Sequence, residues 1–511
     1  GTFGSHDLTV MAGFENYYMK DEELTAARDK YELTGYPYLN IGSEDFQTNS
    51  GKGSEYTSNS VFGRVIYSYA DRYLFQANIR HDGSSRFAKG YRWGTFPSFS
   101  AGWVMSEEKF MKSLNWDWLS FLKLRGSWGI LGNERIGDDY FPYIALMSFG
   151  NSLFYMADGS VVSDKTARPA ILAVEDITWE TTTSTDFGLD ANFFNNRLQF
   201  HFDYYWKQTK DMLLKIEIPY FMGYNNPNTN AGKMSTHGYD IELAWNDRIG
   251  DLQYGVNVNF SDFLSKIDYM NDGEQISNGK IKRAGVLFNE YYGYVCDGIY
   301  QTQEEVNNSA RTSTTVTVGD LKYRDISGPD GVPDGIISPE YDRVPLGNSL
   351  PRFQYGGTFN ASYKGIDFSI AFQGIGKQNS YLSTAMVQPL RDNYGSVPSI
   401  IEGKYWSPFN TAEENLSARY PRLSNVSKSN NYATSSFWMF NGSYFRLKNL
   451  TLGYTLPETW TQKAGIDRVR FYISGSDLFC LSNFPDGWDP EMGASSYPIT
   501  TSLVMGLQVN F

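Results

Sequence analysis

The segment richest in groups that could do chemistry is Gly319–Gly335, which combines acidic, hydroxyl and glycine residues at close spacing. Closely spaced carboxylate and hydroxyl oxygens around a glycine turn are the ligands that Ca²⁺ requires. The segment is similar to an EF-hand loop, but it carries an extra residue before Asp330 and lacks a glutamate at the twelfth position. A cluster of Asp/Gly turns without metal is the alternative. The candidate calcium ligands are Asp325, Ser327, Asp330 and Asp334.

Two further groups of residues could bind a ligand without covalent chemistry. Aromatic side chains can stack on sugar faces or pack against peptide side chains; packing within a loop or against a partner is the alternative. Charged side chains on polar strand faces can hydrogen-bond a substrate, or they can contact neighbouring polypeptide and brace one another. The candidate substrate-binding residues are Tyr291, Tyr292, Tyr294, Arg80, Arg125 and Trp488.

Several functional classes are excluded. Acidic pairs are dispersed, and neither a Gly-x-Ser-x-Gly motif nor a phosphate-binding glycine loop occurs, so we do not expect an enzyme. A net charge of −13 without a Lys/Arg cluster argues against nucleic acid. Cys296 and Cys480 are expected to be two unrelated thiols, with a bridge between two loops as the alternative.

The elements that must position these groups are strands. Leu503, Met505, Leu507, Val509 and Phe511 alternate with polar residues or glycine, which is typical of a strand with one apolar and one polar face. About 14 segments of roughly 9–13 residues share this pattern, near the length a tilted strand needs to cross a bilayer. The chain is therefore expected to be all-β.

Composition agrees with strands that cross a membrane. The chain has 511 residues and is 16% aromatic, yet its mean hydropathy is only −0.43. No run of 18 apolar residues occurs, which excludes a membrane-spanning helix. A barrel keeps its mean hydropathy low because the lumen face of each strand is polar. Since no linker or internal repeat is visible, residues 1–511 are expected to form one barrel portion without a separate second domain.

The connections between these segments alternate between tight turns and long loops. Tight turns are expected at 70–72, 194–197, 246–250 and 363–365, and long loops at about 19–56, 132–176, 266–350 and 378–436. Outer-membrane barrels sort their connections in this way, with short periplasmic turns and long extracellular loops. Two connections fit less well, because 105–118 is long for a periplasmic turn and 86–92 is short for an outer loop. The apolar phase also slips near Lys448 and Asn449, which predicts a β-bulge.

Motifs along nearly the whole chain resemble the SusC/RagA family of TonB-dependent outer-membrane transporters of Bacteroidota. They are Tyr73–Phe87 (YLFQANIRHDGSSRF), Trp93–Trp103, Leu122–Gly129 with Gly132 and Asn133, Trp179–Thr181, Trp406–Pro408, Tyr420–Leu423, Ser443–Asn449 and Trp488–Glu491.

The resemblance implies an antiparallel transmembrane β-barrel of 22 strands, of which this chain holds about the last 14. No plug domain is found, so a plug and about eight strands are expected to be missing or on another polypeptide; a complete 14-strand barrel is the alternative. The first and last strands are then expected to pair with that polypeptide rather than with each other.

The implied function is TonB-dependent import of a glycan, oligosaccharide or peptide through the outer membrane of a Gram-negative bacterium, in which the chain is a multi-pass protein. The expected partners are a SusD-like lipoprotein, TonB acting through a plug segment, and outer-membrane lipid. A passive pore or surface-binding barrel without energy coupling is the alternative.

Overall fold

Antiparallel strands dominate the computed structural model, which describes residues 1–511 except 37, 138–139, 272, 383–396, 398, 493–496 and 498. The chain divides into two bodies. The first body comprises Gly1–Val104, Arg125–Asp186 and Lys207–Met234. The second body comprises Met105–Leu124, Phe187–Trp206 and Ser235–Phe511. The expectation of an all-β, antiparallel chain is confirmed.

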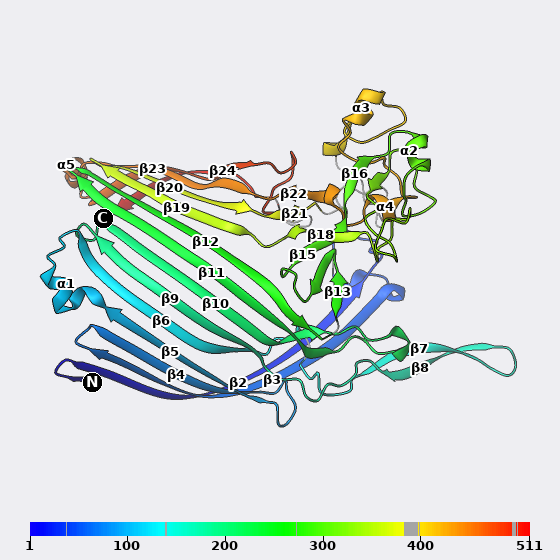
Figure 1. Ribbon diagram of the computed structural model, residues 1–511, viewed down its shortest axis with the longest axis horizontal. Helices are drawn as coiled ribbons and strands as arrows, with labels where there is room; N and C mark the ends of the chain where they lie inside the picture. The colour runs from blue at the N-terminus through cyan, green and yellow to red at the C-terminus, as the bar shows by residue number, and fades with distance from the viewer. Residues whose placement is uncertain are drawn as a thin grey trace. The chain divides into compact units, whose positions relative to one another are not determined.

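Among the described residues the largest sheet has 15 strands. Apart from the short strands within the long loops, strands that follow one another in the chain are neighbours in this sheet (Figure 1). Its first strand has two residues. The strands are β1 (Thr2–Phe3), β2 (His6–Arg28), β3 (Gln47–Tyr69), β4 (Tyr73–Ser84), β5 (Trp93–Val104), β6 (Leu119–Asn133), β9 (Glu180–Phe193), β10 (Leu198–Lys215), β11 (Asn228–Ile249), β12 (Leu252–Met270), β19 (Arg352–Tyr363), β20 (Ile366–Lys377), β23 (Tyr444–Thr455), β24 (Arg468–Ser482) and β25 (Ser502–Asn510).

Shorter elements fill the long connections. Four small sheets are β13 (Glu274–Ser277) with β14 (Lys280–Arg283), β15 (Glu290–Tyr294) and β18 (Arg343–Asn348); β16 (Cys296–Ile299) with β17 (Leu321–Tyr323); β21 (Asn379–Tyr381) with β22 (Met439–Asn441); and β7 (Met147–Tyr155) with β8 (Val161–Pro169). The α-helices are α1 (Lys109–Ser113), α2 (Gln303–Asn307), α3 (Ala412–Leu416), α4 (Lys428–Asn431) and α5 (Glu458–Thr461). The 3₁₀ helices are η1 (Leu39–Ile41), η2 (Glu44–Phe46), η3 (Met105–Glu107), η4 (Tyr220–Met222), η6 (Ser399–Ile401), η7 (Ser436–Trp438) and η8 (Gln462–Ala464).

The predicted tight turns are confirmed, with one shift in position. Ala70 and Asp71 both have positive φ, of 52° and 53°, between β3 and β4. Two consecutive left-handed residues are what a two-residue hairpin turn needs. The turn expected at 246–250 lies later, because β11 continues to Ile249 and β12 begins at Leu252.

The long loop expected at about 19–56 is wrong over much of its length. Strands β2 and β3 continue past the apolar segments, and their ladder runs without a break from His6 opposite Tyr69 to Arg28 opposite Gln47. Residues 29–46 alone connect them. The extra length carries Lys20, Glu22 and Glu23, which are exposed, so no apolar alternation marks it. The predicted loop at 378–436 lies partly outside the described residues.

Exposed apolar side chains mark one face of the terminal strands in the second body. Leu503, Met505 and Leu507 of β25 are all exposed, and so are Phe471 and Ile473 of β24 opposite them. Such a row of large apolar side chains is costly in water and favourable in lipid. Among the described residues, no helix is long and apolar enough to span a membrane.

Candidate functional site

The bulge in β23 is the local feature that builds the most highly charged cluster of the second body. The strand register passes from Leu447 to Asn449 on both sides, so Lys448 has no partner in either ladder. The predicted bulge is therefore confirmed. A bulge re-aims side chains, and Arg446 and Lys448 are both held by acidic groups.

The segment Trp488–Glu491 folds against this bulge. Arg446 lies 2.6 Å from Asp489 and 2.5 Å from Glu491, and its side chain is 4% exposed. Lys448 lies 2.8 Å from Asp477. Arg446 and two carboxylates thus fasten the last loop to β23, and the pair of Lys448 and Asp477 joins β23 to β24. Sequence reasoning identified both motifs by resemblance but gave no sign that they contact each other.

Trp488 lies where this segment meets the core of the loops. Its ring packs against a cluster of buried hydrophobic residues in the loops, called the loop core. Its indole Nε1 is buried and has no hydrogen-bond partner among the described residues. An unpaired buried donor is costly. The loop core comprises Tyr294, Leu321, Tyr323, Ile337, Leu382, Ile401, Tyr420 and Trp438.

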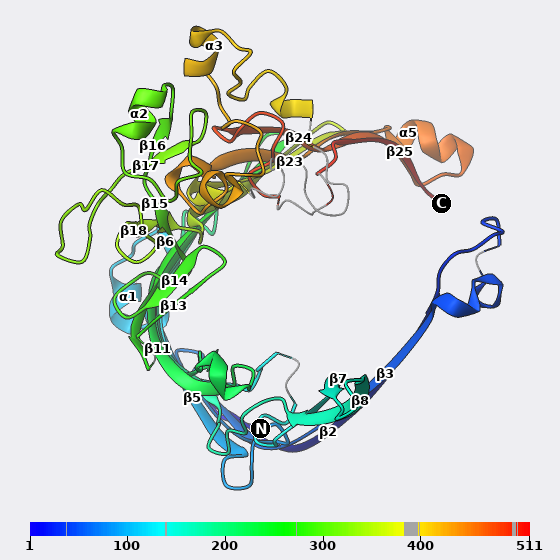
Figure 2. The same ribbon diagram turned by 90° about the vertical axis from the view of Figure 1, so that its right-hand side faces the viewer.

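The three candidate tyrosines of β15 lie in or beside this core. Figure 2 labels the strands β15, β16 and β17, which contribute residues to it. Tyr294 stacks on Tyr323 with ring centroids 4.9 Å apart, and it is 9% exposed. Tyr292 is 8% exposed beneath Arg343. Tyr291 is half-buried against Tyr381, and burial raises the pKa of its hydroxyl. Burial also raises the pKa of Tyr294. Tyr291 is therefore the most accessible of the three.

A buried ion pair joins two loops of the second body beside this core. Asp320 is fully buried and accepts a hydrogen bond from Arg422 Nε at 2.6 Å and another from Asn431 at 2.8 Å. Arg422 also donates to Ser427 at 2.8 Å. The buried Asp320 carboxylate is tolerated because it is hydrogen-bonded and paired with Arg422, whose side chain is partly exposed. Asp320 and Arg422 are 102 residues apart, so no local pattern could have predicted this pair.

Two of the three carboxylates in the candidate calcium site accept hydrogen bonds from nearby backbone. Asp325 accepts from the Gly335 N–H at 2.7 Å, and Asp334 accepts from the Ile336 N–H at 2.9 Å. Asp342 is fully buried and accepts from three backbone N–H groups. The described part of the chain contains no group of three or more His, Cys, Asp or Glu side chains arranged to hold a metal ion. This arrangement matches an Asp/Gly turn cluster, and the calcium site, with Ser327 and Asp330, stays a prediction.

The two candidate arginines lie in the first body and are held by carboxylates. Arg80 of β4 lies 2.8 Å from Glu15 and 2.6 Å from Asp82. Arg125 of β6 lies 3.7 Å from Asp186. Both guanidinium groups thus brace neighbouring strands. Cys296 and Cys480 are free thiols, as expected.

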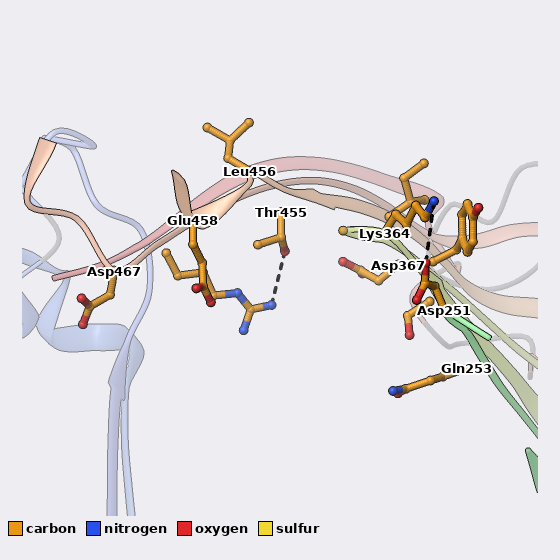
Figure 3. A pocket seen from close by; sticks show the side chains of 13 residues that line it. Asp251, Gln253, Lys364, Asp367, Thr455, Leu456, Glu458 and Asp467 are labelled. Carbon is orange, nitrogen blue, oxygen red and sulfur yellow. Dashed lines mark hydrogen bonds and ion pairs between the residues drawn. The ribbon is translucent and has the colours of Figure 1, made fainter. Parts of the chain in front are cut away.

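A groove of about 440 Å³ lies at the turn ends of β12, β19 and β23. Lys364 turns toward Asp251 at 3.7 Å, and Arg468 donates to the Thr455 hydroxyl (Figure 3). Nearby, Arg470 donates to Asp367 at 2.8 Å. The Lys364 and Asp251 side chains are both exposed, so their pair contributes little to stability.

The family of the chain follows from its similarity to known proteins. Residues 1–474 match the family described as TonB dependent receptor-like, beta-barrel. TonB-dependent receptor P3 of Formosa agariphila is 30% identical over 100% of this chain and 51% of its own length. TonB-dependent receptor SusC of Bacteroides thetaiotaomicron is 29% identical over 100% of this chain and 49% of its own length. The chain spans about half the length of the curated relatives it matches.

A solved structure, that of the RagAB peptide transporter, is similar over 100% of this chain and 54% of the solved chain, with a TM-score of 0.80 and 24% identity. At this identity the likeness shows a shared fold. The resemblance to SusC and RagA is confirmed by these matches. The chain belongs to the TonB dependent receptor-like β-barrel family.

Proposed function

We propose that the protein imports a glycan, oligosaccharide or peptide across the outer membrane of a Gram-negative bacterium, driven by TonB and working with a SusD-like surface lipoprotein. The observation that carries the proposal is the likeness of the whole chain to SusC and to the RagAB peptide transporter. The exposed apolar rows of β24 and β25 support a location in lipid. Barrels of this family lie in the outer membrane.

The chain is proposed to supply the last 14 of 22 barrel strands, with the plug and the remaining strands lying outside residues 1–511. The coverage of about half of each curated relative supports this proposal. In the second body, β25 has β24 as its partner on one side, which leaves its other edge for a further strand. An unpaired edge in lipid would cost several kcal/mol per backbone group.

Substrate binding is proposed to use Trp488 and Tyr291 most directly. The buried indole N–H of Trp488 has no acceptor among the described residues, and Tyr291 presents a half-buried ring beside Tyr381. Binding would be by stacking and hydrogen bonding, and gating would be conformational, with no covalent chemistry. Arg80 and Arg125 would bind substrate only in exchange for Glu15, Asp82 and Asp186.

Growth of a deletion strain tests the proposal. The strain that encodes the protein is compared with its deletion mutant on a panel of single glycans and peptides as sole nutrient. We expect loss of growth on one nutrient class and its recovery when the intact gene is restored. An unchanged growth profile across a panel that supports the parent strain would contradict nutrient import.

A further inference from the structure

The connection from β5 to β6 is longer than its neighbours at the turn end and carries an apolar surface of its own. Residues 105–118 contain η3 and α1, and Phe110 and Leu114 stand four residues apart, on one side of α1. Lys112 falls on the opposite side and pairs with Glu107. Phe110 is 52% exposed, Leu114 46% and Trp116 44%. Large apolar side chains that are exposed together mark an interaction surface.

An aromatic ladder ties this connection to the strands that follow it in the second body. Trp116 stacks on Trp118 with centroids 5.2 Å apart, and Trp118 stacks on Phe193 at 5.8 Å with nearly parallel planes. The ring centroids of Phe194 and Trp245 are 6.3 Å apart. The backbone N–H of Phe194 donates to the Trp118 carbonyl at 2.8 Å. The position of the connection on the strand ends is thereby fixed.

The ladder continues the apolar face of the strands. Trp118 directly precedes β6, and Leu124 of β6 is exposed. Phe187 and Phe193 of β9 are separated by an even number of residues and therefore share a side, and Phe187 is exposed. The surface of the connection is thus continuous with the face proposed to contact lipid.

We propose that residues 105–118 are an interfacial anchor that inserts Phe110, Leu114 and Trp116 at the headgroup boundary of the inner, periplasmic leaflet. Tryptophan favours this boundary because its ring is apolar and its N–H is polar. The partner is phospholipid, because the patch extends the apolar strand face that is proposed to contact lipid. The inference rests on the proposed outer-membrane location.

Spin-label accessibility tests the anchor. The full protein, with Cys296→Ser and Cys480→Ser, is placed in nanodiscs of phosphatidylethanolamine and phosphatidylglycerol. A nitroxide is attached to Phe110→Cys, and collisions with oxygen and with a water-soluble nickel chelate are measured. Lys112→Cys, on the opposite side of α1, is the matched control, and Leu124→Cys reports the strand face.

We expect the ratio of oxygen to nickel accessibility at Phe110→Cys to exceed that at Lys112→Cys and to fall below that at Leu124→Cys. A water-like ratio at Phe110→Cys with a lipid-like ratio at Leu124→Cys overturns the anchor alone. Shielding of Phe110→Cys from both reagents indicates a protein contact and also overturns the anchor. A water-like ratio at Leu124→Cys overturns the membrane location itself.

Discussion

At the scale of single residues, Arg446 is the group on which the last loop depends. Its buried guanidinium holds Asp489 and Glu491. Removing one partner of a buried ion pair typically costs about 3–5 kcal/mol because the remaining charge is left unpaired. We expect Arg446→Ala to raise the rate of proteolysis within residues 483–501 roughly a hundredfold or more, since about 1.4 kcal/mol is tenfold. Arg468→Ala, at an exposed turn-end arginine, should leave the rate unchanged, and equal rates for both variants would contradict the assignment.

The two core tryptophans differ in a way that separates packing from ligand binding. Trp438 Nε1 donates to the Asn431 carbonyl at 2.9 Å, whereas Trp488 Nε1 has no partner among the described residues. Trp438→Phe should lower loop stability by about 1–3 kcal/mol because a buried carbonyl loses its donor. Trp488→Phe should cost less, and it should weaken substrate binding if its N–H meets substrate. The rate of proteolysis of the loop, which reports its unfolding, checks the stability of each variant. A binding isotherm for each variant checks substrate binding.

The reactivity of Cys296 follows from its burial. Burial raises the pKa of this thiol to about 11, and the thiolate is the reactive form. At pH 8 a thiol with a pKa of 9 is about 10% ionised and one with a pKa of 11 about 0.1%, so alkylation should be roughly a hundredfold slower than for an ordinary cysteine. In a Cys480→Ser background the rate should rise about tenfold per pH unit up to pH 11. A plateau near pH 9 would show that the thiol is not shielded.

At the scale of elements, the segment 325–342 is a turn cluster organised by Asp342. Asp342→Asn replaces one acceptor oxygen by a donor that faces a backbone N–H, so we expect faster proteolysis of this segment, equivalent to about 1–3 kcal/mol. Asp330 is exposed, and Asp330→Asn is the matched control. The calcium prediction is tested in the same assay. A turn cluster gives equal rates with Ca²⁺ or EDTA, whereas a calcium site gives protection that Asp330→Asn removes.

Much of the strand pattern could be predicted because a strand in lipid must alternate apolar and polar residues. The turns at Ala70 and Phe194 and the bulge at Lys448 were predicted on the same ground, since each breaks or reverses that alternation. The extensions of β2 and β3 were missed because Lys20 and Glu22 lie in strands outside the apolar region, where no alternation is required. Backbone pairing between β2 and β3 extends both strands over this region instead.

The candidate site was harder to predict than the strands. Tyr291, Tyr294 and Trp488 were identified as aromatic loop residues, and all three belong to or adjoin one buried cluster. Their arrangement depends on contacts between loops that are far apart in sequence, such as the pair of Asp320 and Arg422. Nothing near either residue in the sequence indicates its partner. The ion pairs of Arg446 and Arg422 could therefore be found only from the structure.

At the scale of the whole molecule, the proposed function requires strands that face lipid and loops that bind substrate. It also requires energy from TonB, delivered through polypeptide outside residues 1–511. The match of residues 1–474 to a TonB-dependent family supports energy coupling, while a passive pore of similar strands would conduct without it. The two mechanisms share a fold and differ in whether transport stops when energy is withheld.

The central claim is tested most directly by uptake of the nutrient on which the deletion strain fails to grow. Initial rates are measured with labelled nutrient in cells that carry the intact protein, with and without TonB, and in the deletion strain as background. The account predicts that uptake without TonB falls to the background of the deletion strain. Uptake that persists at its full rate without TonB, while remaining dependent on the protein, would contradict active import and establish a passive pore.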